Sequence, residues 1–112
     1  MATSETVDSS LRTLGDDSFE RVVDAEDAVL VEFYTEWCGT CRQMEPALES
    51  IRADTGVAVL KVDIESHLET AIEFGAQRTP TFVLFADSRP VVQRQGSQPE
   101  AALRDLVETY VE

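Results

Sequence analysis

Both cysteines of this 112-residue chain lie in one short segment, Trp37-Cys38-Gly39-Thr40-Cys41. The spacing places Cys38 and Cys41 at positions i and i+3, and residues three apart share one side of a helical turn. Their side chains can therefore meet and form a disulfide that opens and closes. The pattern predicts reversible thiol-disulfide chemistry.

The two sulfur atoms should have different roles. If Cys38 begins the helix that follows, unbonded backbone N–H groups and the helix dipole favour its thiolate over its thiol. This lowers the pKa of Cys38 and makes it the attacking sulfur. Cys41 would lie one turn inside the helix, shielded from solvent. We expect it to resolve the mixed disulfide that Cys38 forms.

Other uses of the two cysteines are weaker interpretations. A structural disulfide between them would close a very small loop and add little stability. Half of a zinc site is another possibility, but structural zinc needs four ligands and the chain offers only His67 beyond its carboxylates. We therefore predict no metal, and no cofactor other than the redox-active disulfide itself. We expect His67 to be a solvated residue in the first turn of a helix, with no catalytic role.

The length of the chain is sufficient for one hydrophobic core. We expect one domain over residues 11–112, preceded by a flexible tail over residues 1–10, which are small and polar. The tail has no basic segment or apolar run of the kind that directs export, and no stretch of the chain reaches a membrane-spanning length. The sequence predicts a cytoplasmic protein with no membrane partner.

The chain is strongly acidic. It has 22 Asp and Glu residues against 9 Lys and Arg, a formal net charge of -13, and Lys61 is its only lysine. This charge excludes nucleic acid as a partner and favours a monomer in low salt. Because salt screens such self-repulsion, the composition resembles that of cytoplasmic proteins from salt-accumulating halophiles. An ordinary acidic protein is the alternative interpretation.

Hydrophobic patterns predict strands and helices in alternation. Strands are expected over 28–34, 57–62, 81–85 and 91–95, with a possible short edge strand over 11–14 and a hairpin turn at Asp87-Ser88. Capping patterns predict three helices that begin near Asp17-Ser18, Ser66 and Ser97, with Glu20, Glu69 and Glu100 three residues after Asp17, Ser66 and Ser97. Another helix should run from the cysteines to Gly56, with a kink at Pro46. The predicted apolar helix faces are Met44, Ala47, Leu48 and Ile51; Leu68, Ala71 and Ile72; and Leu103, Leu106, Val107 and Tyr110.

This order predicts an α/β fold. Strand–helix alternation requires parallel crossovers, and the chain ends in an antiparallel hairpin and a helix. We expect a mixed five-stranded sheet with four helices covering both faces. Glu32 is the one polar residue of the predicted central strand, so burial should raise its pKa. The alternative is an exposed Glu32 on an edge strand.

An ordered set of segments resembles the thioredoxin family over most of the chain. The segments are Val31-Glu32-Phe33, Glu36 to Cys41, Pro46, Thr79-Pro80-Thr81 and Gly96. The resemblance implies a thioredoxin fold and a reductase of protein disulfides that is recharged by a thioredoxin-reductase-type donor. It also implies that Cys38 is the nucleophile, Cys41 the resolving cysteine, Glu32 a buried acid/base and Pro80 a cis proline. The implied substrate-binding residues are Trp37, Gly39, Thr40, Thr79 and Gly96.

The chain departs from the family pattern at three places. Gly39-Thr40 replaces the usual Gly-Pro between the cysteines, and Glu32 replaces an aspartate. Val59 stands where a lysine often occurs, while Lys61 lies two residues further along on the same face. Two other functions remain as alternatives. One is an interaction module that docks partners through Trp37 and Pro80 without turnover, and the other is a disulfide donor or isomerase.

Overall fold

A computed structural model describes residues 11–111 of the protein, so the tail predicted over residues 1–10 lies outside the described residues. One five-stranded sheet organises this part of the chain, in the order β1-β3-β2-β4-β5. The strands are β1 (Arg12–Thr13), β2 (Ala28–Tyr34), β3 (Ala58–Asp63), β4 (Thr81–Ala86) and β5 (Arg89–Gln95). The predicted central strand is therefore at the centre of the sheet.

The sheet is mixed, as the sequence predicted. β3 runs parallel to β1 and β2, whereas β4 runs antiparallel to β2 and β5 antiparallel to β4. The hairpin between β4 and β5 turns at Asp87 and Ser88, whose φ angles are 53° and 67°. A two-residue hairpin loop favours positive φ at both positions, because that geometry matches the twist of the strands.

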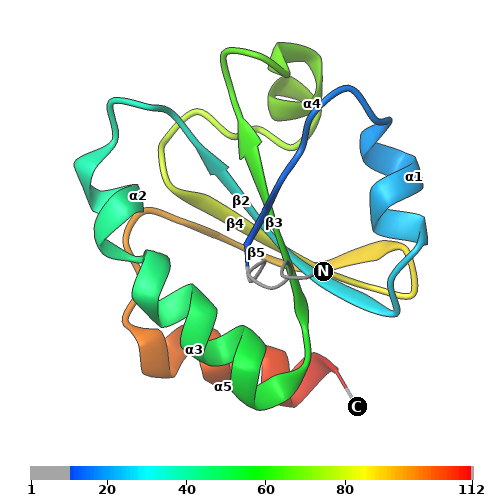
Figure 1. Ribbon diagram of the computed structural model, residues 1–112, viewed down its shortest axis with the longest axis vertical. Helices are drawn as coiled ribbons and strands as arrows, with labels where there is room; N and C mark the ends of the chain where they lie inside the picture. The colour runs from blue at the N-terminus through cyan, green and yellow to red at the C-terminus, as the bar shows by residue number, and fades with distance from the viewer. Residues whose placement is uncertain (1–10, 112) are drawn as a thin grey trace, which may run out of the picture.

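Helices cover both faces of the sheet (Figure 1). Helices α1 (Phe19–Asp24) and α4 (Leu68–Glu73) lie on one side, and α2 (Gly39–Gln43), α3 (Glu45–Thr55) and α5 (Glu100–Tyr110) lie on the other. Each side has its own buried cluster, one built around Phe19 and Phe33 and the other around Leu48 and Leu103.

Alternation along β2 sends neighbouring side chains into different layers. Val31 and Phe33 belong to the cluster under α1 and α4, whereas Leu30 belongs to the cluster under α3 and α5. Glu32 has the same parity as Leu30 and is fully buried. The prediction of a central, buried Glu32 is confirmed.

Residues 11–111 form five helices where four were expected, because the long helix after the cysteines is interrupted. Met44 ends α2 and also precedes α3, and Pro46 occupies the first turn of α3. Proline lacks a backbone N–H and is well tolerated in a first turn, where that donor would have no helical partner. The expected kink at Pro46 is therefore a boundary between two helices.

All three predicted helix starts are displaced by one or two residues. The N-cap of α1 is Ser18, one residue after Asp17, and its hydroxyl accepts a hydrogen bond from the backbone N–H of Arg21. The residues that cap α4 and α5 are His67 and Pro99, and neither makes a side-chain capping bond. Ser66 and Ser97 precede these positions by one and two residues, so they are not at the cap.

The apolar face predicted for α4 is also wrong. Leu68 and Ile72 are 58% and 68% exposed, and Ala71 alone of the predicted three is buried. At 3.6 residues per turn, His67, Ala71 and Phe74 share the inward side, and Leu68 and Ile72 point away from it. Consequently His67 is half-buried and its Nε2 lies 3.3 Å from the carbonyl oxygen of Leu14, rather than being fully solvated.

The buried stripe predicted for α5 is shorter than expected. Leu103 and Val107 are buried and Leu106 is half-buried, but Tyr110 is 45% exposed. Tyr110 is the last residue of α5, one turn beyond the last buried position.

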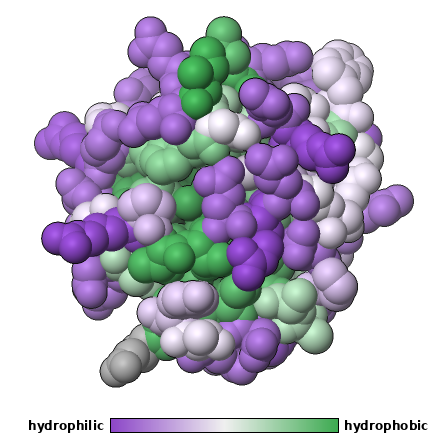
Figure 2. Space-filling model, turned by 180° about the vertical axis from the view of Figure 1, so that it is seen from behind, coloured by the Kyte–Doolittle hydropathy of each residue, from purple (hydrophilic) through white to green (hydrophobic). Residues whose placement is uncertain are grey.

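Figure 2 shows that hydrophilic side chains cover most of the face seen there, and that apolar surface projects over α4.

Candidate functional site

The two cysteines form a disulfide at the start of α2. Cys38 is the N-cap residue of this helix, and Cys41 lies in its first turn, with 5.3 Å between their Cα atoms. The Sγ of Cys38 accepts a hydrogen bond from the backbone N–H of Cys41 at 3.1 Å. The sulfur of Cys38 therefore occupies the place where a helix N-terminus stabilises negative charge.

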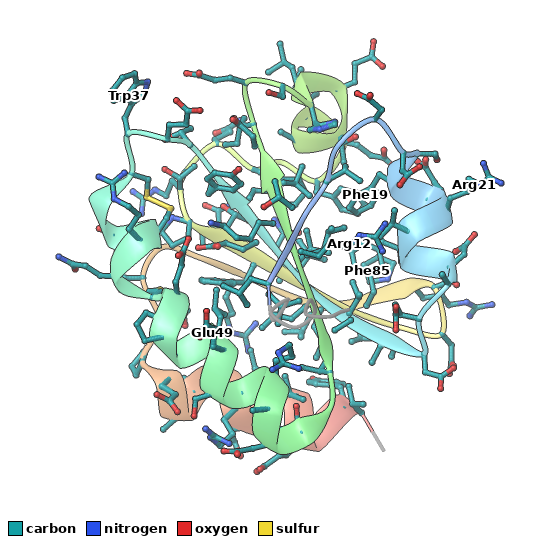
Figure 3. All side chains as sticks on the ribbon, in the orientation of Figure 1. Arg12, Phe19, Arg21, Trp37, Glu49 and Phe85 are labelled. Carbon is teal, nitrogen blue, oxygen red and sulfur yellow. A yellow bond between two sulfur atoms is a disulfide. The ribbon has the colours of Figure 1, made fainter. Side chains whose placement is uncertain are left out.

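The two sulfurs differ in exposure. Cys38 is half-buried, whereas Cys41 is 2% exposed. Trp37 is 81% exposed and projects away from the body of the molecule (Figure 3). A hydrogen bond attaches the loop that carries Trp37 to α2. The Nη1 of Arg42 donates to the carbonyl oxygen of Glu36 at 2.9 Å.

A second segment reaches the same end of the sheet. Phe33, near the carboxyl end of β2, pairs with Thr81 at the start of β4, and Thr81 pairs with Gln95 at the end of β5. The residues that flank these three positions must therefore lie together at one end of the strands. They are the cysteine segment, Thr79-Pro80 and Gly96.

Backbone contacts fix the Thr79-Pro80 segment. The peptide bond between these two residues is cis, and the backbone N–H of Gly96 donates to the carbonyl oxygen of Pro80 at 2.7 Å. Thr81, buried at the start of β4, donates from Oγ1 to the carbonyl oxygen of Arg78 at 2.6 Å. Gly96 has a φ of 87°, a conformation that suits glycine.

Glu32 is a buried carboxyl group without a hydrogen-bond partner among the described residues. Burial raises its pKa from 4.5 to about 7. The ammonium group of Lys61 opposes this rise and the carboxylate of Glu45 adds to it. A carboxyl group with such a pKa can both accept and release a proton near neutral pH.

Lys61 does not pair with Glu32. Its Nζ forms an ion pair with Oε2 of Glu45 and lies 4.5 Å from the centre of the Tyr34 ring. A groove of about 450 Å³ runs beside these groups, and its lining includes Trp37, Cys41, Glu45 and Lys61. The groove joins the surface at Trp37 to the buried Cys41.

Sequence reasoning missed Glu45, although one signal was available. Glu45 follows Cys41 by four residues, a spacing that can bring two side chains to one side of a helical segment. Thr81 was identified as part of a motif, but its role in holding the preceding loop was not predicted. Lys61 was noted, but its ion pair with Glu45 was not predicted.

Within residues 11–111, the structure shows no group of three or more His, Cys, Asp or Glu side chains arranged to hold a metal ion. No helix in the same range is both long and apolar enough to cross a bilayer. The chemistry that the site does offer is thiol-disulfide exchange at the two cysteines.

A family model described as Thioredoxin matches residues 10–109. The chain belongs to the thioredoxin family. It is a disulfide oxidoreductase, and the Cys38–Cys41 pair is its redox centre.

Individual family members resemble the chain over most of its length. A thioredoxin from Alicyclobacillus acidocaldarius is 40% identical, covering 86% of this chain and 97% of its own. A thioredoxin from Mycolicibacterium smegmatis is 39% identical, with coverage of 86% and 90%. Among solved structures, a mutant thioredoxin from Halobacterium salinarum superposes with a TM-score of 0.85 at 38% identity, covering 92% of both chains.

Proposed function

We propose that this thioredoxin-family protein reduces protein disulfides with Cys38 as the nucleophile and Cys41 as the resolving cysteine. The asymmetry of the pair is the observation that carries this assignment. Cys38 is half-buried with its sulfur at the N-terminus of α2, while Cys41 is enclosed. A bulky protein disulfide can approach the first sulfur and is kept from the second.

The first step is attack by the Cys38 thiolate on one sulfur of the target disulfide. The S–S bond of the target breaks, a mixed disulfide forms, and one target sulfur leaves as a thiolate that takes up a proton. Hydrogen bonding from the Cys41 N–H stabilises negative charge on Cys38 before attack.

The second step is attack by Cys41 on the Sγ of Cys38. Cys41 must first lose its proton, and we assign Glu32 as the acceptor. Glu32 lies on the sheet face covered by α2 and α3, and it can take up a proton near neutral pH. The second target sulfur then leaves as a thiolate. Two electrons have passed to the target, and the Cys38–Cys41 disulfide remains.

Substrate binds around Cys38, at the end of the strands where β2 finishes and β4 begins. Trp37 offers an exposed aromatic surface, and Gly39 and Thr40 are exposed beside it. We also assign Thr79, Pro80 and Gly96 to this site, because the register of β2, β4 and β5 supports a common location for their segments. Thr79 and Gly96 are half-buried, and Pro80 is buried. A shallow surface of this kind accepts an extended segment that carries the target disulfide.

The partners follow from the chemistry. The oxidised pair needs a reductase-type electron donor, and the targets are disulfide-containing proteins. The net charge of -13 supports a monomer that does not bind nucleic acid. We place the protein in the cytoplasm, in accordance with the typical location of the family, and the acidic composition together with the Halobacterium relative supports a halophilic source.

The redox potential of the Cys38–Cys41 pair tests this function. A reductase should be strongly reducing. The reference value for thioredoxin is about -270 mV, and we expect a potential of that order. A potential of about -120 mV would instead identify a disulfide donor. Insulin reduction by the wild type, and its loss in Cys38→Ser, should accompany the reducing value.

A further inference from the structure

Lys61 has two carboxyl groups near it and pairs with only one. It lies opposite Glu32 in the parallel register of β2 and β3. Its Nζ nevertheless bonds to Oε2 of Glu45, at the start of α3, while neither oxygen of Glu32 has a partner within the described part of the chain. The only lysine of the chain is thus paired with Glu45 and not with the fully buried Glu32.

This choice of partner matters for proton transfer. An ammonium group within about 4 to 6 Å of a carboxylate stabilises the charged form and makes it a weaker proton acceptor. If Lys61 paired with Glu32, the carboxylate would hold its charge to lower pH. It would then accept the proton of Cys41 less readily near neutral pH.

We propose that Glu45 is a positioning residue for Glu32: by binding the Lys61 ammonium on the solvent side of the sheet face, it keeps the buried carboxyl group unpaired and able to exchange a proton. The inference rests on the proposed role of Glu32 in the second step. Tyr34 assists Glu45, because the ammonium group also lies against the face of its ring.

The charged and titratable groups around Glu32 come from several elements. β3 contributes Lys61, α3 contributes Glu45, and β2 itself contributes Tyr34. Cys41 of α2 lines the same groove as Lys61 and Glu45. β4 and α5 place apolar residues on this face, among them Phe82, Leu103 and Val107.

The exposures of the Lys61 and Glu45 side chains agree with an ion pair on the solvent side of Glu32. The side chain of Lys61 is 14% exposed and that of Glu45 is 34% exposed, so the ion pair lies between the buried carboxyl group and water. The effects on the pKa of Glu32 have the matching signs, because Lys61 lowers it and Glu45 raises it. Removing Glu45 should therefore strengthen the hold of Lys61 on Glu32.

The direct test is a carbon-13 NMR titration of the Glu32 carboxyl group in the oxidised protein. In Glu45→Gln, the midpoint should fall by about one to three pH units relative to wild type, as expected when an opposite charge comes within contact. Glu49→Gln is the matched control, since Glu49 is an exposed residue one turn further along α3 (Figure 3) and its loss changes the net charge equally. Its midpoint should not move, and an unchanged midpoint in Glu45→Gln would overturn the proposal.

A double-mutant comparison separates positioning from a simple change of charge. In a Lys61→Met background, Glu45 has no ammonium to hold, so adding Glu45→Gln should shift the Glu32 midpoint by less than half of its effect in the wild-type background. An equal shift in both backgrounds would show that Glu45 acts only through its own charge, and the proposal would be wrong.

The titration is independent of the proposed function, because it needs no substrate and no turnover. The role of Glu32 in the second step is tested separately by the rate at which Glu32→Gln resolves a preformed mixed disulfide. If that rate equals the wild-type rate while the titration midpoints move as expected, the positioning holds and the proton-acceptor role fails. If the rate falls and the midpoints do not move, the proton-acceptor role holds and the positioning fails.

Discussion

Lys61 and Glu32 lie side by side on neighbouring parallel strands, yet no hydrogen bond joins them. The lysine is instead held by Glu45, and Glu32 is left as a buried carboxyl group whose pKa is raised to about 7. An unpaired acid of this kind costs stability when it ionises, because the charge has no partner and little solvent. The chemistry of the site and the stability of the fold are therefore linked through one residue.

The free energy of unfolding should depend on pH through Glu32. The folded-state pKa lies above the unfolded value, so the stabilising effect of the protonated group is fully present below pH 4.5 and is lost as pH rises through about 7. Above that range, Glu32→Gln should be more stable than wild type by up to about 3 kcal/mol, since one pKa unit corresponds to about 1.4 kcal/mol. Urea melts from pH 4 to pH 9 measure the difference.

The control for this prediction is Glu49→Gln, which removes an exposed carboxylate from α3. Its stability relative to wild type should change little across the same pH range. If Glu32→Gln were less stable than wild type at pH 9, the cost of burying the charge of Glu32 would have been assigned wrongly.

Salt should stabilise the protein. The excess of 13 negative charges creates repulsion that is relieved on unfolding, and molar potassium chloride screens it. We expect the melting temperature to rise steadily from low salt to molar salt at pH 7.5. Near pH 4, where about half of the carboxylates are protonated, the salt effect should be much smaller. A melting temperature that does not change with salt concentration at pH 7.5 would remove the support for the halophilic interpretation.

Gly96 should not tolerate a side chain. Its φ of 87° is unfavourable for any residue with a Cβ, so Gly96→Ala should lower the free energy of unfolding by about 1 to 2 kcal/mol. Gly15→Ala is the comparison, because Gly15 has no positive φ and open space around its Cβ position. Denaturant melts of both variants test the prediction, and equal stability of the two would contradict it.

Much of the fold could be predicted from local pattern. β2 alternates apolar side chains on both faces except at Glu32, and this pattern marks a central strand. The turn at Asp87 and Ser88 follows from residue types that accept positive φ between two apolar runs. The strongest signals were those in which neighbouring residues decide the conformation.

The errors arose where tertiary packing decides the outcome. A six-residue helix such as α4 has too few positions for periodicity to identify its inward side, so Leu68 and Ile72 were assigned to the wrong face. Glu45 contacts Lys61 only because α3 packs against the sheet at that position, and no local pattern encodes the pair. The cysteines themselves were predictable because spacing alone brings them together.

The order of attack by the two cysteines is tested most directly by trapping the mixed disulfide. Cys41→Ser, incubated in reduced form with a disulfide-containing protein such as insulin, should accumulate a covalent adduct through Cys38, because no resolving sulfur remains. Cys38→Ser is the matched variant and should form little adduct, since Cys41 is 2% exposed. Mass spectrometry of the linked peptides identifies the sulfur involved. Adducts on Cys38 are the predicted result, and adducts that form faster on Cys41 would contradict the assignment of nucleophile and resolving cysteine.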